Sequence, residues 1–240
     1  MTTASSKKIT TKTNSLPGRA LYRSPIGKKI LTGITGVGLV VFIIAHLLGN
    51  LLLFVSPGTY NAYGHALERL GPVLWLIEIV LLLVIVGHAS LGIQIYLNSR
   101  RARTTPYQAY QSAGKPSHQT LSSRTMIWSG LTLAIFVVWH LATFKFGPYQ
   151  LVESTTGPVR DLASLVFDAF RKPLYTVSYT LLLGLLGAHL RHGIWSALQS
   201  LGVLGGQAQV SVARLSTGLA ASITIGFLAV PWAIYWGWLG

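Results

Sequence analysis

The stretch that decides the fold is residues 30–54, ILTGITGVGLVVFIIAHLLGNLLLF, which holds no charged side chain and a single histidine, His46. About 20 consecutive apolar residues are enough for a helix to cross the hydrocarbon core of a bilayer. Four further stretches of this kind lie at about residues 73–97, 126–144, 174–198 and 215–239. The sequence therefore predicts an all-α fold, an integral membrane bundle of five helices.

The composition of the 240-residue chain agrees with this fold. Hydrophobic residues make up 51% of the chain and charged residues 10%, whereas a soluble domain carries about 25% charged residues. Residues 30–240 are predicted to form one transmembrane domain, and the basic residues 1–29 a flexible cytoplasmic tail. A transit peptide is the alternative for this segment, because no acidic residue precedes Glu68. Cysteine is absent, which excludes disulfides and cysteine-ligated iron–sulfur clusters on this chain.

Lysine and arginine are distributed unevenly over the connections between spans. Of the 19 such residues, most fall on the side of the predicted membrane that holds the N-terminus. Five fall on the other side, namely Arg69, Lys145, Arg160, Arg171 and Lys172. The positive-inside rule then predicts a multi-pass protein of the cell (inner) membrane with its N-terminus in the cytoplasm and its C-terminus outside.

The net charge of +14 is interpreted as a result of this topology and of attraction to anionic membrane lipid. No nucleic-acid partner is expected, because no base-reading motif accompanies the charge. In the connections, residues 158–171 have apolar side chains at near-helical spacing and are predicted to form a short helix in the membrane interface. Residues 107–118 are polar and are predicted to form an exposed cytoplasmic loop.

Each of the first four spans contains one intramembrane histidine: His46, His88, His140 and His189. Ionisable side chains inside a membrane are costly, and by default they mark a site. Because successive helices run in opposite directions and rise 1.5 Å per residue, His46 and His140 should lie near the outer end. His88 and His189 should lie near the inner end. The two levels are expected about 15 Å apart.

Two imidazoles that face each other suit the two axial positions of a low-spin haem iron. A zinc or copper site would instead need three or four ligands at one depth. We therefore predict two b haems, with His46 and His140 as iron ligands of the outer haem and His88 and His189 as iron ligands of the inner haem. The residues predicted to surround the haems or an inner quinone site are Gly49, Gly92, Gly193, Arg191, His192 and Ser196.

Several sequence runs resemble one known family. They include SPIGKK at 24–29, HLLGNL at 46–51 and, as the most specific, GAHLRHGIWSALQSLG at 187–202. In these runs, and over most of its length, the chain resembles the di-haem cytochrome b membrane anchor of succinate dehydrogenase and fumarate reductase, in the five-helix, single-subunit form. One departure is Gly187, where some fumarate reductases of this class carry a glutamate for transmembrane proton return.

The resemblance implies the same four histidine ligands and a role in respiratory complex II. It implies that electrons pass between an iron–sulfur subunit and a quinone, often menaquinone, through the two haems. It also implies a flavoprotein subunit with FAD that holds the succinate site, so that this chain is not the succinate-oxidising subunit. The iron–sulfur clusters and the FAD then belong to partner chains.

Glu68 and Glu78 are candidate proton acceptors, because a quinol oxidised near the outer haem must release protons. A carboxylate that merely reaches the membrane interface is the alternative for each, and a quinone site near His192 and Ser196 is the alternative location. Two other functions stay open. One is the membrane cytochrome b of a hydrogenase or formate dehydrogenase, and the other is a haem-free proton-coupled transporter.

Overall fold

The computed structural model describes residues 22, 24–102, 121–154, 157–203 and 208–240. Its helices and strands are α2 (Pro25–Leu51), η1 (Leu52–Phe54), α3 (Pro57–Glu68), α4 (Pro72–Arg101), α5 (Leu121–Arg124), α6 (Met126–His140), η2 (Leu141–Lys145), β1 (Leu151–Ser154), β2 (Gly157–Arg160), α7 (Leu162–Phe170), α8 (Pro173–Ser200) and α9 (Ala208–Tyr235). In this part of the chain, five helical segments are long and apolar enough to cross a membrane. The predicted all-α bundle of five membrane helices is confirmed.

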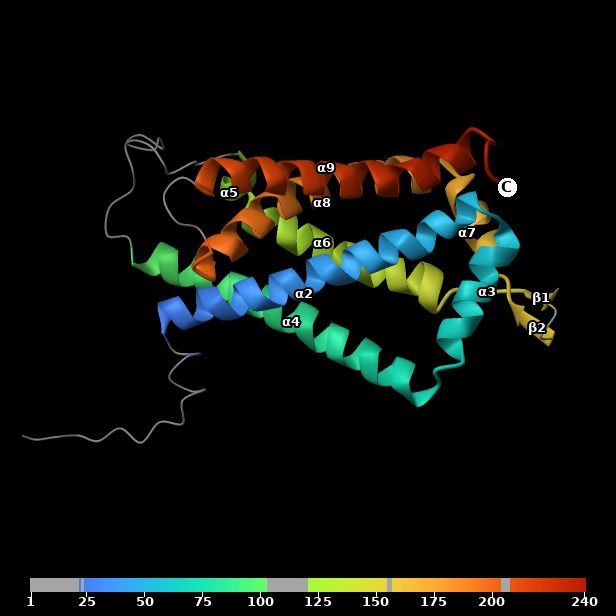
Figure 1. The fold of residues 1–240 in the computed structure, drawn as a ribbon, viewed down its shortest axis with the longest axis horizontal. Helices are drawn as coiled ribbons and strands as arrows, with labels where there is room; N and C mark the ends of the chain where they lie inside the picture. Colours follow the sequence, from blue (N-terminus) through green and yellow to red (C-terminus); the bar gives the residue numbers. More distant parts are fainter. Residues whose placement is uncertain (1–21, 23, 103–120, 155–156, 204–207) are drawn as a thin grey trace, which may run out of the picture.

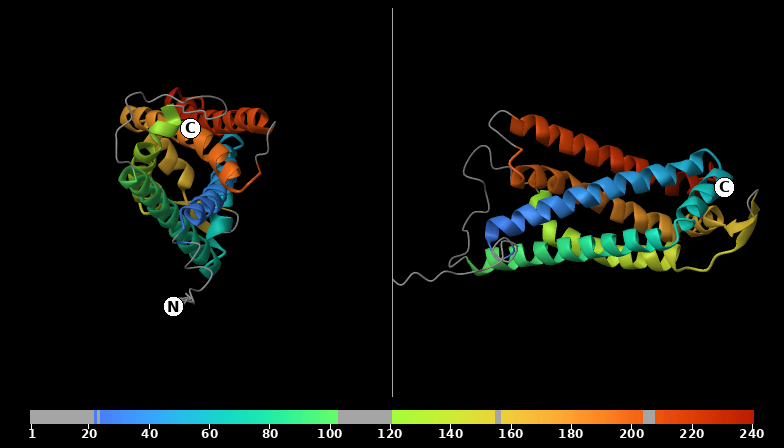
Figure 2. Two further views of the ribbon diagram at one scale, coloured as in Figure 1. Left: turned by 90° about the vertical axis from the view of Figure 1, so that its left-hand side faces the viewer. Right: turned by 60° about the horizontal axis from the view of Figure 1, so that its bottom comes forward.

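The five long helices run alternately up and down one bundle (Figures 1 and 2). The beginning of α2 and the end of α9 therefore lie at opposite ends. One end holds α3, α7 and the two strands, and is called the outer end here after the predicted topology. The opposite end, where α4 finishes and α6 begins, is called the inner end.

Proline and polar capping residues set the start of several helices. Pro25, Pro72 and Pro173 each occupy the first turn of a helix, as the sequence predicts, where the missing N–H costs no hydrogen bond. Ser24 caps α2 by accepting a hydrogen bond from the backbone N–H of Gly27 at 2.8 Å. Gly71 precedes α4 with φ of 53°, a conformation that residues with a side chain rarely adopt.

The predicted boundaries of the first and last spans need correction. Because Ser24 and Pro25 start α2, the helix begins at Pro25 and includes the last residues of the predicted tail. The rest of that tail lies largely outside the described residues, as does the predicted loop at 107–118. The last helix ends at Tyr235 and not at Leu239, because the chain turns at Gly237, where φ is 74°.

Helix α9 packs closely along α8 and α2 through small residues. A side chain at Gly187 would collide with Thr224, and a Cβ atom at Gly226 would lie 2.9 Å from Cδ2 of Leu47. The helices therefore approach more closely at these positions than larger side chains would allow. The contact with Thr224 gives a packing reason for glycine at position 187.

The outer end carries structure that the sequence did not predict. Helix α3 forms in the first outer connection, and β1 pairs with β2 in an antiparallel hairpin in the second. The predicted interfacial helix at 158–171 is shorter than expected, because Val159 belongs to β2 and the helix α7 spans Leu162–Phe170. Val166 and Phe170 of α7 are buried in a cluster with Leu183 of α8. This helix thus packs into the end of the bundle.

Asn61 joins α3 to α7 and is only 7% exposed. Its side-chain N–H donates to Asp161 at 2.9 Å, and its side-chain oxygen accepts from the backbone N–H of Ala163 at 2.9 Å. We expect Asn61→Ala to lower the free energy of unfolding by about 1–3 kcal/mol, because buried polar groups lose their partners. Thermal unfolding in detergent measures this. The exposed Asn98→Ala should change it by less than about 0.5 kcal/mol, and equal effects would contradict the role of Asn61.

Asp161 makes the stability of this joint depend on pH. Partial burial alone would raise the pKa of Asp161, but hydrogen bonds from Ser164 and Asn61 hold it below its ordinary value of 3.8. The carboxylate therefore stabilises the fold at neutral pH, and this contribution is lost as the pH falls from 3.8 through the folded-state pKa. On acidification, wild-type protein should lose more stability than Asp161→Asn. Parallel acid unfolding curves would contradict this.

Candidate functional site

The structure brings the four intramembrane histidines together as two pairs. At the outer level, the rings of His46 on α2 and His140 on α6 lie with centroids 5.7 Å apart and planes at 89°. At the inner level, His88 lies on α4 and His189 on α8, and each ring contacts a hydroxyl group of a neighbouring helix. The pairs come from the helices that the depth argument selects. Ligation of metal by these side chains stays a prediction.

The outer pair has a spacing that suits two axial ligands of one metal. Two metal–nitrogen bonds of about 2 Å each, together with the two ring radii, would place the centroids about 6 Å apart. The observed 5.7 Å between the His46 and His140 rings is close to this value. Both rings come from facing helices, so the donor set fits the iron of a haem b.

Aromatic side chains surround the outer pair. Phe42 is stacked on His46 with centroids 5.6 Å apart and planes at 13°, and Phe227 of α9 lies 5.9 Å from the same ring. Phe144 lies 5.3 Å from His140. These rings give the two imidazoles apolar surroundings, which suit a flat apolar macrocycle.

Polar groups contact both outer histidines. The Tyr179 hydroxyl lies 3.2 Å from Nδ1 of His140. Asn50 donates to the carbonyl of His46 at 2.8 Å, and its Nδ2 lies 3.5 Å from the Nε2 atom of His46. The Tyr60 hydroxyl of α3 donates to Oδ1 of Asn50 at 3.4 Å. Burial raises the pKa of Tyr60 to about 12, assisted by Tyr63 and opposed by Arg160, so this hydroxyl keeps its proton at neutral pH.

Hydroxyl groups also contact both inner histidines. Thr35 of α2 lies with its Oγ1 3.1 Å from Nδ1 of His88. Ser129 of α6 lies with its Oγ 3.0 Å from Nδ1 of His189. The sequence analysis missed both residues, because helical spacing alone does not show which hydroxyl faces a neighbouring helix.

The predicted glycines have different surroundings. A Cβ atom at Gly49 would lie 2.7 Å from the Tyr63 ring, so the close approach of α3 accounts for this glycine without a cofactor. A Cβ atom at Gly193 would meet Met126 at 3.6 Å, and one at Gly92 would meet no atom within 4 Å. Of these three glycines, Gly92 therefore has the most open space around the position of its missing side chain.

Of the predicted inner residues, Arg191 lines a cavity of about 550 Å³, which is also lined by Ser129 and Ala188. This volume is within the usual range for small-molecule sites. The Arg191 guanidinium donates to the Thr217 hydroxyl at 3.2 Å. His192 lies against Trp195 with ring centroids 6.1 Å apart, and Ser196 follows one turn later on α8.

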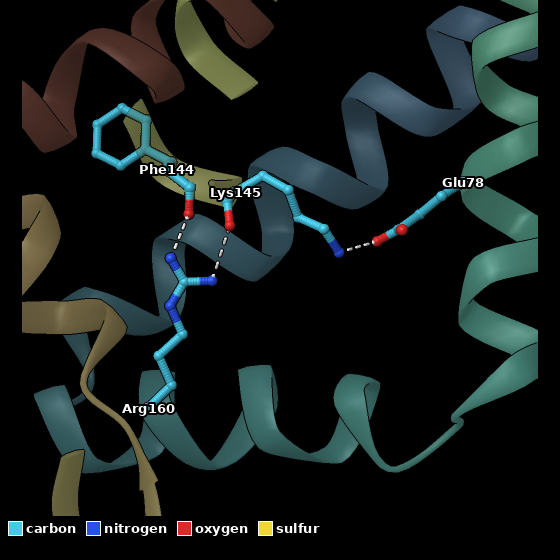
Figure 3. Close-up of polar contacts among 4 residues, drawn as sticks. All are labelled: Glu78, Phe144, Lys145 and Arg160. Carbon is cyan, nitrogen blue, oxygen red and sulfur yellow. Dashed lines mark hydrogen bonds and ion pairs between the residues drawn. The ribbon is translucent and has the colours of Figure 1, made fainter. Parts of the chain in front are cut away.

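Glu78 is not an isolated carboxylate. It forms an ion pair with Lys145, at the end of the π-helix η2 that follows His140 (Figure 3). Arg160 of β2 donates to the backbone carbonyls of Phe144 at 2.9 Å and Lys145 at 3.2 Å. These contacts connect α4, η2 and the hairpin. The negative charge of Glu78 is balanced by the positive charge of Lys145.

Glu68 has different surroundings, at the end of α3. It lines an outer cavity of about 280 Å³ together with His65, Tyr149 and Arg160. The Arg160 guanidinium also lies 4.7 Å from the centre of the Tyr149 ring. A proton acceptor at this place would therefore have a guanidinium, an imidazole and a phenol hydroxyl beside it.

Among the residues that the structure describes, no three histidine, cysteine, aspartate or glutamate side chains gather in a group that could hold a metal ion. The histidines are instead arranged in twos. Comparison of the chain with protein-family models, with curated proteins and with solved structures gave no match in any of the three.

Proposed function

We propose that this chain is the membrane anchor and electron-transfer subunit of a succinate:quinone oxidoreductase that carries two b haems. The observation that supports this most directly is the arrangement of the four intramembrane histidines as two pairs. Each pair supplies two ligands, which is the number that a low-spin haem iron accepts from protein. The resemblance of residues 187–202 to the di-haem anchor family supports the choice of reaction.

In this proposal, haem b supplies a one-electron redox couple at each level. His46 and His140 hold the outer group, and His88 and His189 hold the inner group. The phenylalanines at the outer level give the two imidazoles apolar surroundings. The helices that carry the histidines form their backbone hydrogen bonds internally, as the interior of a membrane requires.

This chain has no cysteine, so in this proposal it receives electrons from an iron–sulfur subunit. We propose that this partner docks at the inner end. That end carries Arg100, Arg101 and Arg124. Crosslinking of the assembled complex should connect the partner to this end and to His192. Crosslinks to the Glu68 end would contradict both the docking and the predicted topology.

Measurement of haem content tests the proposal. Pyridine-haemochrome analysis of the purified chain should return two b haems for each polypeptide, and the reduced spectrum of the native protein should be typical of bis-histidine ligation. A count of zero haems would contradict the proposed cytochrome b function and favour the haem-free transporter. Two haems in a complex that oxidises hydrogen or formate and not succinate would favour the membrane cytochrome of another dehydrogenase.

A further inference from the structure

Helices α2 and α6 share a short repeat that ends at the outer histidines. Residues 35–46 read TGVGLVVFIIAH, and residues 129–140 read SGLTLAIFVVWH. Both begin with a hydroxyl residue and glycine, carry phenylalanine at the same place and end in histidine. Eleven residues make about three helical turns, so the hydroxyl and the histidine of each repeat lie on the same side of their helix.

The first residue of each repeat touches an inner histidine. Thr35 contacts His88 at 3.1 Å and Ser129 contacts His189 at 3.0 Å, in both cases at Nδ1. The glycines touch the same rings. A Cβ atom at Gly36 would lie 3.2 Å from Cε1 of His88, and one at Gly130 would lie 3.4 Å from Cε1 of His189. The same two-residue unit therefore packs against both inner rings.

The hydroxyl protons have their own acceptors. Thr35 donates to the carbonyl of Leu31 at 2.8 Å, and Ser129 donates to the carbonyl of Met126 at 3.0 Å. A hydroxyl has one proton, so towards the imidazole each oxygen accepts. In the tautomer that this bonding favours, the Nδ1 atoms of His88 and His189 carry hydrogen. In a neutral ring this leaves the lone pair on Nε2.

From these contacts we infer that Thr35 and Ser129 are a matched pair of positioning residues for the inner haem. This inference rests on the proposed function. Each hydroxyl fixes the tautomer of an inner ligand so that Nε2 can bind iron, and each glycine lets the ring approach the neighbouring helix. Helices α2 and α6 thus each carry one ligand of the outer haem and one residue that positions a ligand of the inner haem.

The hydrogen bonds should also set the redox potential of the inner haem. A ligand imidazole that donates its other N–H becomes a more basic ligand. The more basic ligand favours ferric over ferrous iron, because the ferric ion has the higher charge. Removal of either hydroxyl should therefore raise the potential of the inner haem and leave that of the outer haem unchanged.

Potentiometric titration of the purified holoprotein tests this. Thr35→Val and Ser129→Ala should each shift the same one of the two haem transitions upwards, by up to about tenfold in the reduction equilibrium constant, or about 59 mV for one electron. Thr35→Ser and Ser129→Thr should restore the wild-type value. Thr180→Val is the matched control, because the Thr180 hydroxyl bonds to the carbonyl of Thr176 at 2.7 Å. It should shift neither transition.

Shifts in different transitions, or in neither, would overturn the inference. If a variant fails to bind haem, a second measurement on the full-length apoprotein tests the role of the hydroxyl groups. Nitrogen NMR of ¹⁵N-histidine-labelled chain should show His88 and His189 with hydrogen on Nδ1, and Thr35→Val should change the first alone. Nδ1 without hydrogen in the wild-type chain would overturn the inference. A haem-free wild-type protein would instead overturn the proposed function, and the NMR result would still decide the role of the hydroxyls.

Discussion

Replacement of His46 or His140 by alanine should reduce the haem content from two to one for each chain, and the same haem should be lost in both variants. His88→Ala and His189→Ala should remove the other haem. The reason is that one imidazole cannot supply both axial bonds, and the rings of the outer pair already face each other within the bundle. Pyridine-haemochrome analysis counts the haems, and redox titration identifies the one that remains.

His192→Ala is the matched control for the ligand variants, because His192 lies one turn from His189 on α8. Both haems should remain in this variant. If His46→Ala and His88→Ala abolished the same redox transition while the complex stayed assembled, the pairing by depth would be wrong. Loss of a haem in His192→Ala with retention of both in His189→Ala would move the inner ligand to His192.

Glu68→Gln should lower quinone-linked turnover by about 100-fold, which is the lower range for loss of a positioned proton acceptor. Glu68 lines the outer cavity beside Tyr149 and Arg160, so it is placed to take protons released at that end. Succinate oxidation with a soluble dye and both haem spectra should stay unchanged. This combination separates a defect in proton release from a defect in assembly or electron transfer.

Glu78→Gln is the comparison for Glu68. Its carboxylate already pairs with Lys145, so its loss should affect quinone turnover less than the loss of Glu68. Normal quinone turnover in the double variant would exclude both carboxylates as the proton route. The inner region near His192 and Ser196 would then become the better place for the quinone.

The membrane helices and the meeting of His46 with His140 could be predicted because each depends on one local property. Apolar runs set the helices, and counting residues from the start of a run sets the depth of His46 or His189. Side-chain partners could not be predicted in this way. The contact of Thr35 with His88 depends on how two helices are rotated about their axes, and the pairing of Glu78 with Lys145 depends on how α4 meets the end of α6.

The outer connections were predicted least well. Helix α3 and the hairpin are short, and their stability comes from contacts with other parts of the chain, such as Asn61 with Asp161. Short segments of this kind carry little periodic signal in the sequence. The outer cavity around Glu68 is built from these segments, so its lining residues Tyr149 and Arg160 were not predicted as neighbours of Glu68.

Helix α9 is the last membrane helix of the bundle to be synthesised. It carries no histidine, yet its Phe227 lies 5.9 Å from the His46 ring and its Gly226 packs against Leu47. All four histidines are added to the chain before this helix is made. At about 5–20 residues per second, the interval between His189 and Tyr235 lasts about 2–10 seconds. During synthesis, the side of His46 that Phe227 later covers therefore stays open to lipid for that time.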